Sequence, residues 1–269
     1  MARHRKTRSI GSKDGKVNFK LTIAYDGANY NGWQVQNRHR GRMREIRTVQ
    51  GTIEDALDKI FSTKVRLISS SRTDSGVHAE GHVANFTINS MLTPEQLKRA
   101  VNSILPTDIL VKSVKKAKID FNAQFDSRSK VYRYVIYNGD YVPPVKRNYV
   151  YHCKQRLDVG LMKREARGII GTRDFAAFRS SCGKHNRRLK TNRTVKRLDV
   201  TRKGSYITID IEADGYLYNM VRNIVGTLLE VGRGKFKPGA SRVILRSRDR
   251  RKAGPAVPSK GLCLIKVKY

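Results

Sequence analysis

The chain has 269 residues, enough to bury a sizeable core in one large domain or two small ones. Hydrophobic residues make up 39% of it, which excludes a disordered basic tail, and no apolar run reaches the roughly 18 residues of a membrane span. The formal net charge is +34, and self-repulsion of this size favours a polyanionic partner, nucleic acid before an anionic membrane.

The first half of the chain alternates between strand and helix patterns. Alternating apolar residues predict a half-buried strand over 17–24, followed by a loop over 25–36 that is rich in Gly, Asn and aromatic residues. Apolar residues at helical spacing predict an amphipathic helix over about 49–61. Pro94 should begin a second helix. Further strands are expected over 65–71, 82–88 and 110–117.

The second half shows a similar succession of strand and helix patterns. Strands are predicted over 131–137, 196–201, 206–212 and 262–268. A turn at Gly204 joins the two middle strands into a hairpin. Asp158 can cap a helix whose apolar residues continue as far as Ile170. A second apolar helix is predicted over 216–231.

Antiparallel strands with segregated helices indicate an α+β fold rather than a doubly wound sheet. We expect a basic arm over 1–16, an N-terminal half over 17–127 and a C-terminal half over 128–269. The two similar halves suggest a pseudo-two-fold arrangement with antiparallel sheets flanked by helices. The cleft between the halves is then the natural place for an active site.

The stretch from Ser70 to Phe86 carries the strongest chemical signal in the sequence. Asp74 is expected on a turn after a strand, where a carboxylate is held by rigid structure and is exposed to substrate. Arg72 lies two residues away and can help to keep that carboxylate ionised. An ionised, partly desolvated aspartate can act as a nucleophile or a base. The residues alone also permit a simpler interpretation, since Asp-Ser-Gly is commonly only a turn.

Neither a disulfide framework nor a metal site is predicted. The cysteines are far apart, odd in number and without C-x-x-C spacing, which indicates a reducing compartment: they are Cys153, Cys182 and Cys263. His78 and His82 have the spacing of a metal motif. The glutamate between them is not in its H-E-x-x-H place, and Gly81 disfavours the helix that would align the imidazoles.

Seven segments stand in a fixed order along the chain: YDGANYNGWQ, TVQGTIEDAL, SRTDSGVHAEGHVANF, FNAQFDSRSKVYRYVIYN, GTRDFAAF, ADGYLYNMVRNIVGTLLEVGRG and SKGLCLIKVKY. In content and order they resemble the TruA-like pseudouridine synthases. The resemblance covers nearly the whole chain, from about residue 17 to its end. Any one segment would be a weak signal, but seven in register exclude a chance match.

This resemblance implies a reaction and the residues that perform it. The reaction is the isomerisation of uridine to pseudouridine at positions 38, 39 and 40 of the tRNA anticodon stem-loop. No cofactor is implied, because bonds are exchanged within one nucleoside. Asp74 would attack the target nucleoside, Arg72 would help to extrude the base, and Arg222 would pair with the aspartate. Tyr132 would stack on the uracil and assist proton removal at C5. The resemblance also implies a homodimer in which one tRNA spans both subunits.

The residues themselves leave other interpretations open. Tyr132 lies in a strand with other tyrosines, where cross-strand packing is the ordinary role. Arg222 lies among apolar residues of a helix and needs an anionic partner, but any carboxylate or phosphate would satisfy it.

Some residues depart from the family's pattern. Ser71 stands where the family commonly has glycine, and it would be strained if that place needs a positive φ. His82 replaces a more usual glutamine, Asn219 a commoner histidine, and Cys263 a larger residue. The loop over 36–48 is longer than typical and strongly basic. None of these departures removes the aspartate, the tyrosine or the arginine.

Three blocks hold much of the positive charge, around 38–47, 184–197 and 242–252. Such blocks predict a wide basic surface that follows RNA phosphates. The candidate contacts are Arg38, Arg40, Arg42, Lys184, Arg187, Arg188 and Lys190. The alternative is a solvated surface with a biased composition.

The first ten residues lack the apolar core of a secretory signal, so the cytoplasm is the expected compartment. They are basic and free of acids, which fits an RNA-binding arm and also an organelle transit peptide. Three alternatives stay open: a catalytically silent RNA-binding or assembly factor on the same fold, the same reaction on another RNA, and a basic membrane-surface protein. The last would need a long basic amphipathic helix, and none stands out.

Overall fold

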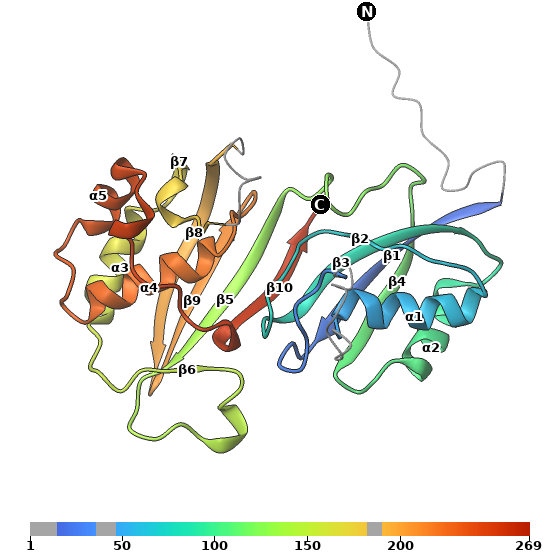
Figure 1. Cartoon of the computed structure of the whole chain (residues 1–269), viewed down its shortest axis with the longest axis horizontal. Helices are drawn as coiled ribbons and strands as arrows, with labels where there is room; N and C mark the ends of the chain where they lie inside the picture. The colour runs from blue at the N-terminus through green and yellow to red at the C-terminus, as the bar shows by residue number, and fades with distance from the viewer. Residues whose placement is uncertain (1–14, 36–46, 182–189) are drawn as a thin grey trace, which may run out of the picture. The chain divides into compact units, whose positions relative to one another are not determined.

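The computed structural model describes residues 15–35, 47–181 and 190–269 of the chain. Their contacts separate the chain into two units. Unit 1 holds the described residues up to Ser127 together with Tyr269, and unit 2 holds Arg128–Lys268. Each unit combines a mostly antiparallel sheet with helices (Figure 1), which confirms the predicted α+β class.

The sheet of unit 1 has the strand order β4-β1-β3. β1 (Lys16–Tyr25) is the middle strand and pairs antiparallel with β3 (His78–Asn89) and with β4 (Ile109–Ala117). The two-residue β2 (Ile68–Ser69) also pairs with β3. Apolar side chains of β1 alternate and are fully buried, as the two-residue period of the sequence predicts: Phe19, Leu21 and Ile23.

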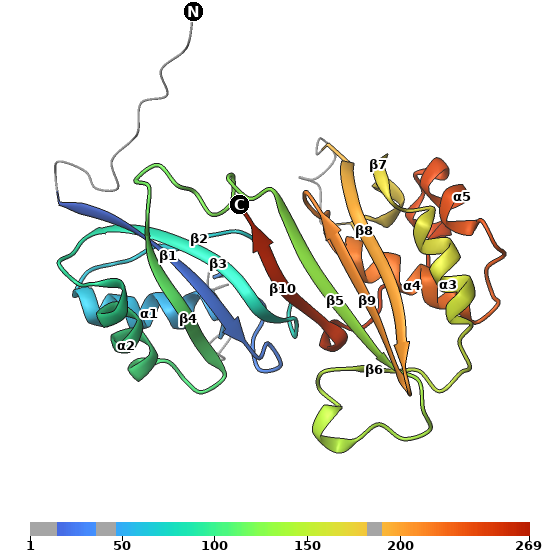
Figure 2. The ribbon, with the colours of Figure 1, turned by 180° about the vertical axis from the view of Figure 1, so that it is seen from behind.

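Two helices cover one face of this sheet, as Figures 1 and 2 show from opposite sides. They are α1 (Val49–Phe61) and α2 (Pro94–Ile104), and both begin where the sequence predicts. The side chain of Thr48 caps α1. Thr93 and Gln96 form a reciprocal capping box at the start of α2. These caps satisfy backbone N–H groups that a helix start leaves without partners inside the helix.

The sheet of unit 2 has the strand order β10-β5-β9-β8-β7. Its strands are β5 (Ser129–Tyr137), β7 (Gly171–Asp174), β8 (Asn192–Lys203), β9 (Tyr206–Ala213) and β10 (Leu262–Lys268). The short β6 (Tyr151–His152) runs parallel to β5. β8 and β9 form the predicted hairpin, which turns at Gly204.

The helices of unit 2 are α3 (Val159–Arg167), α4 (Met220–Gly232) and α5 (Ala240–Ser247). They pack against one another, and in the view of Figure 2 they lie together next to β7 and β8. Nearly all of α4 is buried, which explains its unbroken apolar sequence. α1 and α4 are 13 residues long, and in the described part of the chain no helix has the length and hydropathy that a bilayer crossing requires.

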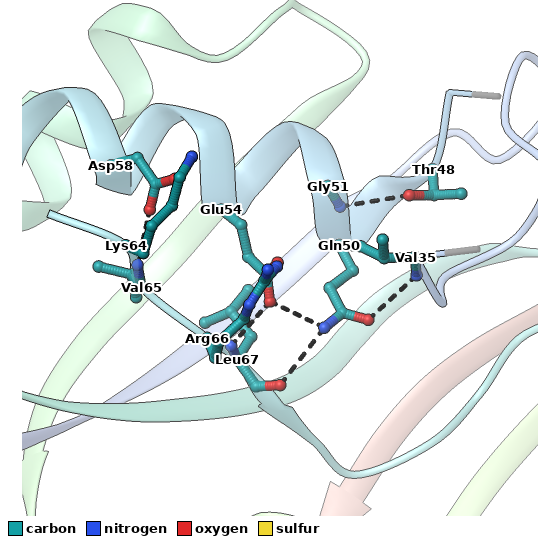
Figure 3. A network of polar contacts seen from close by, with 10 residues as sticks. All are labelled: Val35, Thr48, Gln50, Gly51, Glu54, Asp58, Lys64, Val65, Arg66 and Leu67. Atoms are coloured by element: carbon teal, nitrogen blue, oxygen red, sulfur yellow. Dashed lines mark hydrogen bonds and ion pairs between the residues drawn. The ribbon is translucent and has the colours of Figure 1, made fainter. Parts of the chain in front are cut away.

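The strand predicted over 65–71 is mostly absent, because backbone N–H groups of this stretch donate to side chains of α1 instead of to a neighbouring strand (Figure 3). The Val65 N–H donates to Asp58 Oδ1 at 2.6 Å, and the Leu67 N–H donates to Glu54 Oε1 at 2.9 Å. Val65 and Leu67 are buried, so the alternating pattern correctly predicts which side chains are buried. It wrongly predicts a paired strand over most of this stretch.

Several other boundaries differ from the predictions, and β8 spans Asn192–Lys203 rather than 196–201. β3 begins at His78 rather than at residue 82. α4 begins at Met220 rather than at 216, because Asn219 has a φ of +58°, which an α-helix does not accommodate. α3 ends at Arg167, so Ile170 follows the helix. α5 was not predicted, since its eight residues are too few to show a clear helical period and overlap a basic block.

Glu212 of β9 contributes to the stability of unit 2 in a pH-dependent way. Its carboxylate accepts hydrogen bonds from Lys268 Nζ at 2.8 Å and from Ser129 Oγ at 2.7 Å. The bond from the Lys268 ammonium, followed by that from Ser129, holds the pKa of Glu212 below its ordinary value of 4.5. A carboxyl group whose pKa is lower in the folded chain stabilises the fold above its unfolded pKa and loses this contribution as the pH falls through its folded pKa.

Glu212→Gln should therefore lower the free energy of unfolding by about 1.5–3 kcal/mol near neutral pH, the usual range for hydrogen bonds to a charged group. The difference from the wild type should shrink as the pH falls below the ordinary carboxyl value of 4.5. Urea unfolding at a series of pH values measures this. Asp199→Asn is the matched control, because its side chain is 51% exposed and should matter by less than about 0.5 kcal/mol. A difference that does not change with pH would contradict the assignment.

Candidate active site

Asp74 lies in the short segment between β2 and β3, on the turn that the sequence predicted. Thr73 is buried, Asp74 is half-buried and Arg72 is exposed. The Asp74 carbonyl accepts a hydrogen bond from the Val77 N–H at 3.2 Å, which closes the turn. The Arg72 side chain is thus exposed to solvent, whereas the backbone of the nearby Asp74 is held by a hydrogen bond.

The loop that follows β1 packs directly against this turn. The Trp33 N–H donates to the Thr73 carbonyl at 3.1 Å, and the Gly76 N–H donates to the Tyr30 carbonyl at 3.3 Å. Gly32 has a φ of +85°, and a Cβ atom there would lie 2.5 Å from the Thr73 carbonyl oxygen. Gly32 therefore allows two backbones to meet at a distance that any other residue would prevent.

The N-terminus of α1 holds the same loop from its other side. The Val49 N–H donates to the Gly32 carbonyl at 3.2 Å, and the Gln50 N–H donates to the Trp33 carbonyl at 3.0 Å. These are N–H groups of the first helical turn, which have no acceptor within the helix. The loop thus lies between a helix start and the turn that carries Asp74.

Side chains of α1 extend this anchoring to the segment before the turn (Figure 3). Gln50 Oε1 accepts from the Val35 N–H at 3.3 Å, while its Nε2 donates to Glu54 Oε1 at 2.8 Å. Glu54 also accepts from the Leu67 N–H, and its second oxygen forms an ion pair of 2.7 Å with Arg66. The buried Gln50–Glu54 pair therefore connects the chain after Trp33 with the chain leading into β2.

Tyr132 of β5 lies in unit 2 and is only 6% exposed. Its ring packs edge-on against Tyr216, with ring centroids 5.1 Å apart and planes at 87°. The Tyr216 hydroxyl lies 2.9 Å from the Ile211 carbonyl and 3.0 Å from the Lys130 carbonyl. Burial raises the pKa of Tyr216 well above its ordinary value. Tyr216 is thus neutral and held in place by its hydroxyl, and its ring sets the orientation of the Tyr132 ring.

Arg222 lies in the first turn of α4 and is oriented by neutral oxygens. Its Nε donates to the Val257 carbonyl at 2.7 Å, and one terminal nitrogen donates to Asn219 Oδ1 at 3.0 Å. Asn219 has the left-handed backbone conformation that asparagine tolerates better than most residues. The asparagine that departs from the family's pattern therefore both starts α4 and holds the guanidinium.

Lys130 is a neighbour of Tyr132 that the sequence analysis did not single out. It lies two residues before Tyr132 in β5, so the two side chains share a face of the sheet. Burial lowers the pKa of Lys130, and the nearby Arg193 lowers it further, while Asp214 raises it. The two-residue period around Tyr132 was the signal that could have identified this lysine.

Most of the predicted RNA contacts lie outside the described residues: Arg38, Arg40, Arg42, Lys184, Arg187 and Arg188. Lys190 is described and exposed, and its carbonyl accepts a hydrogen bond from Arg193 at 2.9 Å.

Ser71 does not carry the strain that a positive φ would cause. Within the described chain, the residues other than glycine that have a positive φ are Ser62, Asn219 and Arg248. Of the two described cysteines, Cys153 is buried and Cys263 is half-buried. Nowhere in the described ranges do three His, Cys, Asp or Glu side chains gather as a metal centre would require.

Comparison with known proteins points to one family along the chain. The sequence profile of the family described as "tRNA pseudouridine synthase" matches residues 21–126 and 166–269. These ranges contain Asp74 and Arg222, and Tyr132 lies in the interval between them.

Curated relatives match over almost their whole length. "tRNA pseudouridine synthase A 2" of Clostridium perfringens is 45% identical over 253 residues, which is 94% of this chain and 99% of the relative. "tRNA pseudouridine synthase A" of Acetivibrio thermocellus is 43% identical over 253 residues, with the same coverage of both chains. The protein of that name from Caldicellulosiruptor saccharolyticus is 43% identical over 255 residues, again covering 94% and 99%.

The close approach at Gly32 generates a test of the scaffold. Gly32→Ala should destabilise the protein by about 1–2 kcal/mol for the left-handed backbone and by a further 1–3 kcal/mol for the clash with the Thr73 carbonyl. Gly204→Ala is the matched control, since Gly204 also has a positive φ but has no atom within 4 Å of the added Cβ. Urea unfolding of both variants measures the difference, and equal losses would show that the close approach is unimportant.

Proposed function

The chain belongs to the tRNA pseudouridine synthase family, and on this premise we propose that it isomerises uridine to pseudouridine at positions 38, 39 and 40 of the tRNA anticodon stem-loop. The observation that carries the proposal is the Asp74 turn. The backbone around this half-buried aspartate is held by hydrogen bonds with a loop that α1 anchors in turn. An aspartate in such a place suits attack on a nucleoside, because its position is set before the substrate arrives.

The chemistry needs a group that can bear charge at the sugar. The bond from C1′ to N1 of uracil breaks, the base turns, and a bond from C1′ to C5 forms. The proton at C5 is lost, and N1 gains one, so the atoms balance within the nucleoside. Cleavage develops positive charge at C1′, which a carboxylate stabilises or traps covalently, as in glycoside hydrolysis. We assign this role of nucleophile to Asp74.

The other three residues serve the base and the carboxylate. A uridine in a stem must leave its stack before C1′ is accessible, at a cost of a few kcal/mol. The exposed Arg72 is suited to fill the gap that the base leaves. The Tyr132 ring would stack on the uracil, worth roughly 1–3 kcal/mol, and its hydroxyl would assist proton removal at C5. Arg222 would pair with Asp74 and keep it ionised.

The net charge of +34 supports tRNA as the partner, since phosphates would offset the repulsion among 56 lysine and arginine residues. Lys130 and Arg193, close in space and alike in charge, are the described candidates for a phosphate contact near Tyr132. The proposal includes a cytoplasmic homodimer that binds one tRNA across both subunits. Sedimentation velocity with and without unmodified tRNA would reveal a monomer if the dimer does not form.

Asp74→Ala and Asp74→Asn should lower pseudouridine formation at positions 38–40 by at least about 1,000-fold, because the nucleophile is lost. Pseudouridine mapping on unmodified tRNA incubated with each protein measures this. Asp140→Ala is the control, since Asp140 is an exposed aspartate and should retain full activity.

Activity in Asp74→Ala would show that another group is the nucleophile. A wild-type protein that binds tRNA tightly but modifies no uridine would favour the catalytically silent RNA-binding factor. Modification of a different RNA would keep the reaction and replace the substrate.

Tyr132→Phe keeps the ring and removes the hydroxyl, so it should lower kcat by about 10²- to 10⁴-fold, the usual worth of a proton-transfer group, with little change in KM. Steady-state kinetics on tRNA measure both constants. Tyr134→Phe is the matched control on the same strand, because its hydroxyl donates to the Pro258 carbonyl at 2.8 Å and has no proposed part in the reaction. An unchanged kcat in Tyr132→Phe would show that the hydroxyl has no part in proton removal, so that only the stacking role of the ring would remain.

A further inference from the structure

A row of buried polar side chains lies behind the Asp74 turn in unit 1. Tyr25 Oη lies 2.8 Å from Thr73 Oγ1 and 3.0 Å from His82 Nδ1. On the other side of the imidazole, His82 Nε2 lies 2.8 Å from Ser69 Oγ. His82 is fully buried, and Tyr25 and Thr73 are 5% and 7% exposed. We refer to Thr73, Tyr25, His82 and Ser69 as the His82 row.

Both ends of the His82 row reach the segment that carries Asp74. Ser69 Oγ donates to the Ser71 carbonyl at 2.5 Å and accepts from the Ser71 N–H at 3.2 Å. At the other end, Thr73 is bound through its side chain. Ser71 and Thr73 are the residues on either side of Arg72, and Asp74 follows at once. Through Ser69 and Tyr25, one imidazole therefore connects the Ser71 backbone with the Thr73 side chain, both next to the proposed nucleophile.

The hydrogen bonds of the His82 row have one consistent direction. A neutral imidazole has one N–H donor and one acceptor nitrogen. Since the Ser69 hydroxyl donates to the Ser71 carbonyl, its oxygen must accept from His82 Nε2–H. His82 Nδ1 then accepts from the Tyr25 hydroxyl, whose oxygen accepts from Thr73. Every buried polar group of the row has a partner in this arrangement, which favours one geometry over alternatives.

Trp33 fixes the plane of the imidazole. Its ring stacks on His82 with centroids 3.8 Å apart and planes within 18°. Trp33 also donates its backbone N–H to the Thr73 carbonyl, so the same residue holds both the imidazole and the turn. It is the single tryptophan of the chain, which makes its fluorescence a specific reporter of this region.

We propose that His82 is a positioning residue for the isomerisation: through Ser69 and Tyr25 it sets the backbone of Ser71 and Thr73 and so the direction of the Asp74 carboxylate. His82 itself is buried and takes no proton from the substrate. Its effect on the reaction passes through the turn, and the proposal rests on the proposed role of Asp74. A side chain that only filled space here would contribute to stability and leave the chemical step unchanged.

The experiment uses His82→Leu, which removes both hydrogen bonds, and Tyr25→Phe, which removes only the hydroxyl that links His82 to Thr73. Each should lower kcat for pseudouridine formation by about 10- to 100-fold with KM changed less than about threefold, because a misdirected nucleophile affects chemistry more than binding. The double variant should lose no more than the worse single variant, since both break one connection. His82→Gln, with a donor and an acceptor, should recover part of the loss.

Tyr134→Phe again serves as the control, because it removes a buried tyrosine hydrogen bond in unit 2 and should leave kcat unchanged. Trp33 fluorescence should change in His82→Leu and stay as in the wild type in Tyr25→Phe. The unchanged signal in Tyr25→Phe shows that this variant has kept its fold around the stack, and far-UV circular dichroism gives the same check for His82→Leu. Unchanged kcat in both single variants, or losses that add in the double variant, would overturn the positioning role.

Hydrogen exchange separates this proposal from the proposed function. The Trp33 and Val77 amides bond to carbonyls of the turn, so both should lose protection in His82→Leu whether or not the protein modifies tRNA. Lost protection with an inactive wild type would support the effect of His82 on the turn and reject the proposed reaction. An active wild type with protection and kcat both unchanged in His82→Leu would reject the role of His82 alone.

Discussion

The close approach of two backbones, the loop after β1 and the turn that carries Asp74, is the constraint on which the site depends. Loop and turn are joined by hydrogen bonds at Trp33 and Gly76, and Gly32 leaves room for the Thr73 carbonyl. Backbone contacts of this kind define position more tightly than side-chain contacts, because they involve no rotamer freedom. The backbone that carries Asp74 is thereby placed by groups that have no proposed part in the reaction.

Two polar networks complete this scaffold, and both provide hydrogen-bond partners for backbone groups outside helices and strands. The chain on each side of the turn is irregular, so its backbone groups need partners from elsewhere. The Gln50–Glu54 pair of α1 supplies them for Val35 and Leu67, and the His82 row supplies them for Ser71. Buried networks of this kind are stable only when every member is satisfied, which links the geometry of the turn to residues far away in the sequence.

Unit 2 positions its candidate residues with neutral partners. Tyr216 holds the Tyr132 ring, and Asn219 with the Val257 carbonyl holds the Arg222 guanidinium. None of these partners carries a charge that would compete for the substrate. The formal net charge of the chain, +34, favours a polyanionic partner.

The sequence by itself determined the α+β class, the starts of α1 and α2, the β8–β9 hairpin and the family, because periodicity, capping residues and motifs are local signals. It identified Asp74, Arg72, Tyr132 and Arg222 by resemblance, and their roles stay predictions. Only the tertiary structure decided that α1 side chains bind the backbone at Val65 and Leu67, and that His82 lies behind the Asp74 turn. These contacts join residues 7 or 13 positions apart that lie in different elements, so local signals do not reveal them and tertiary packing selects them.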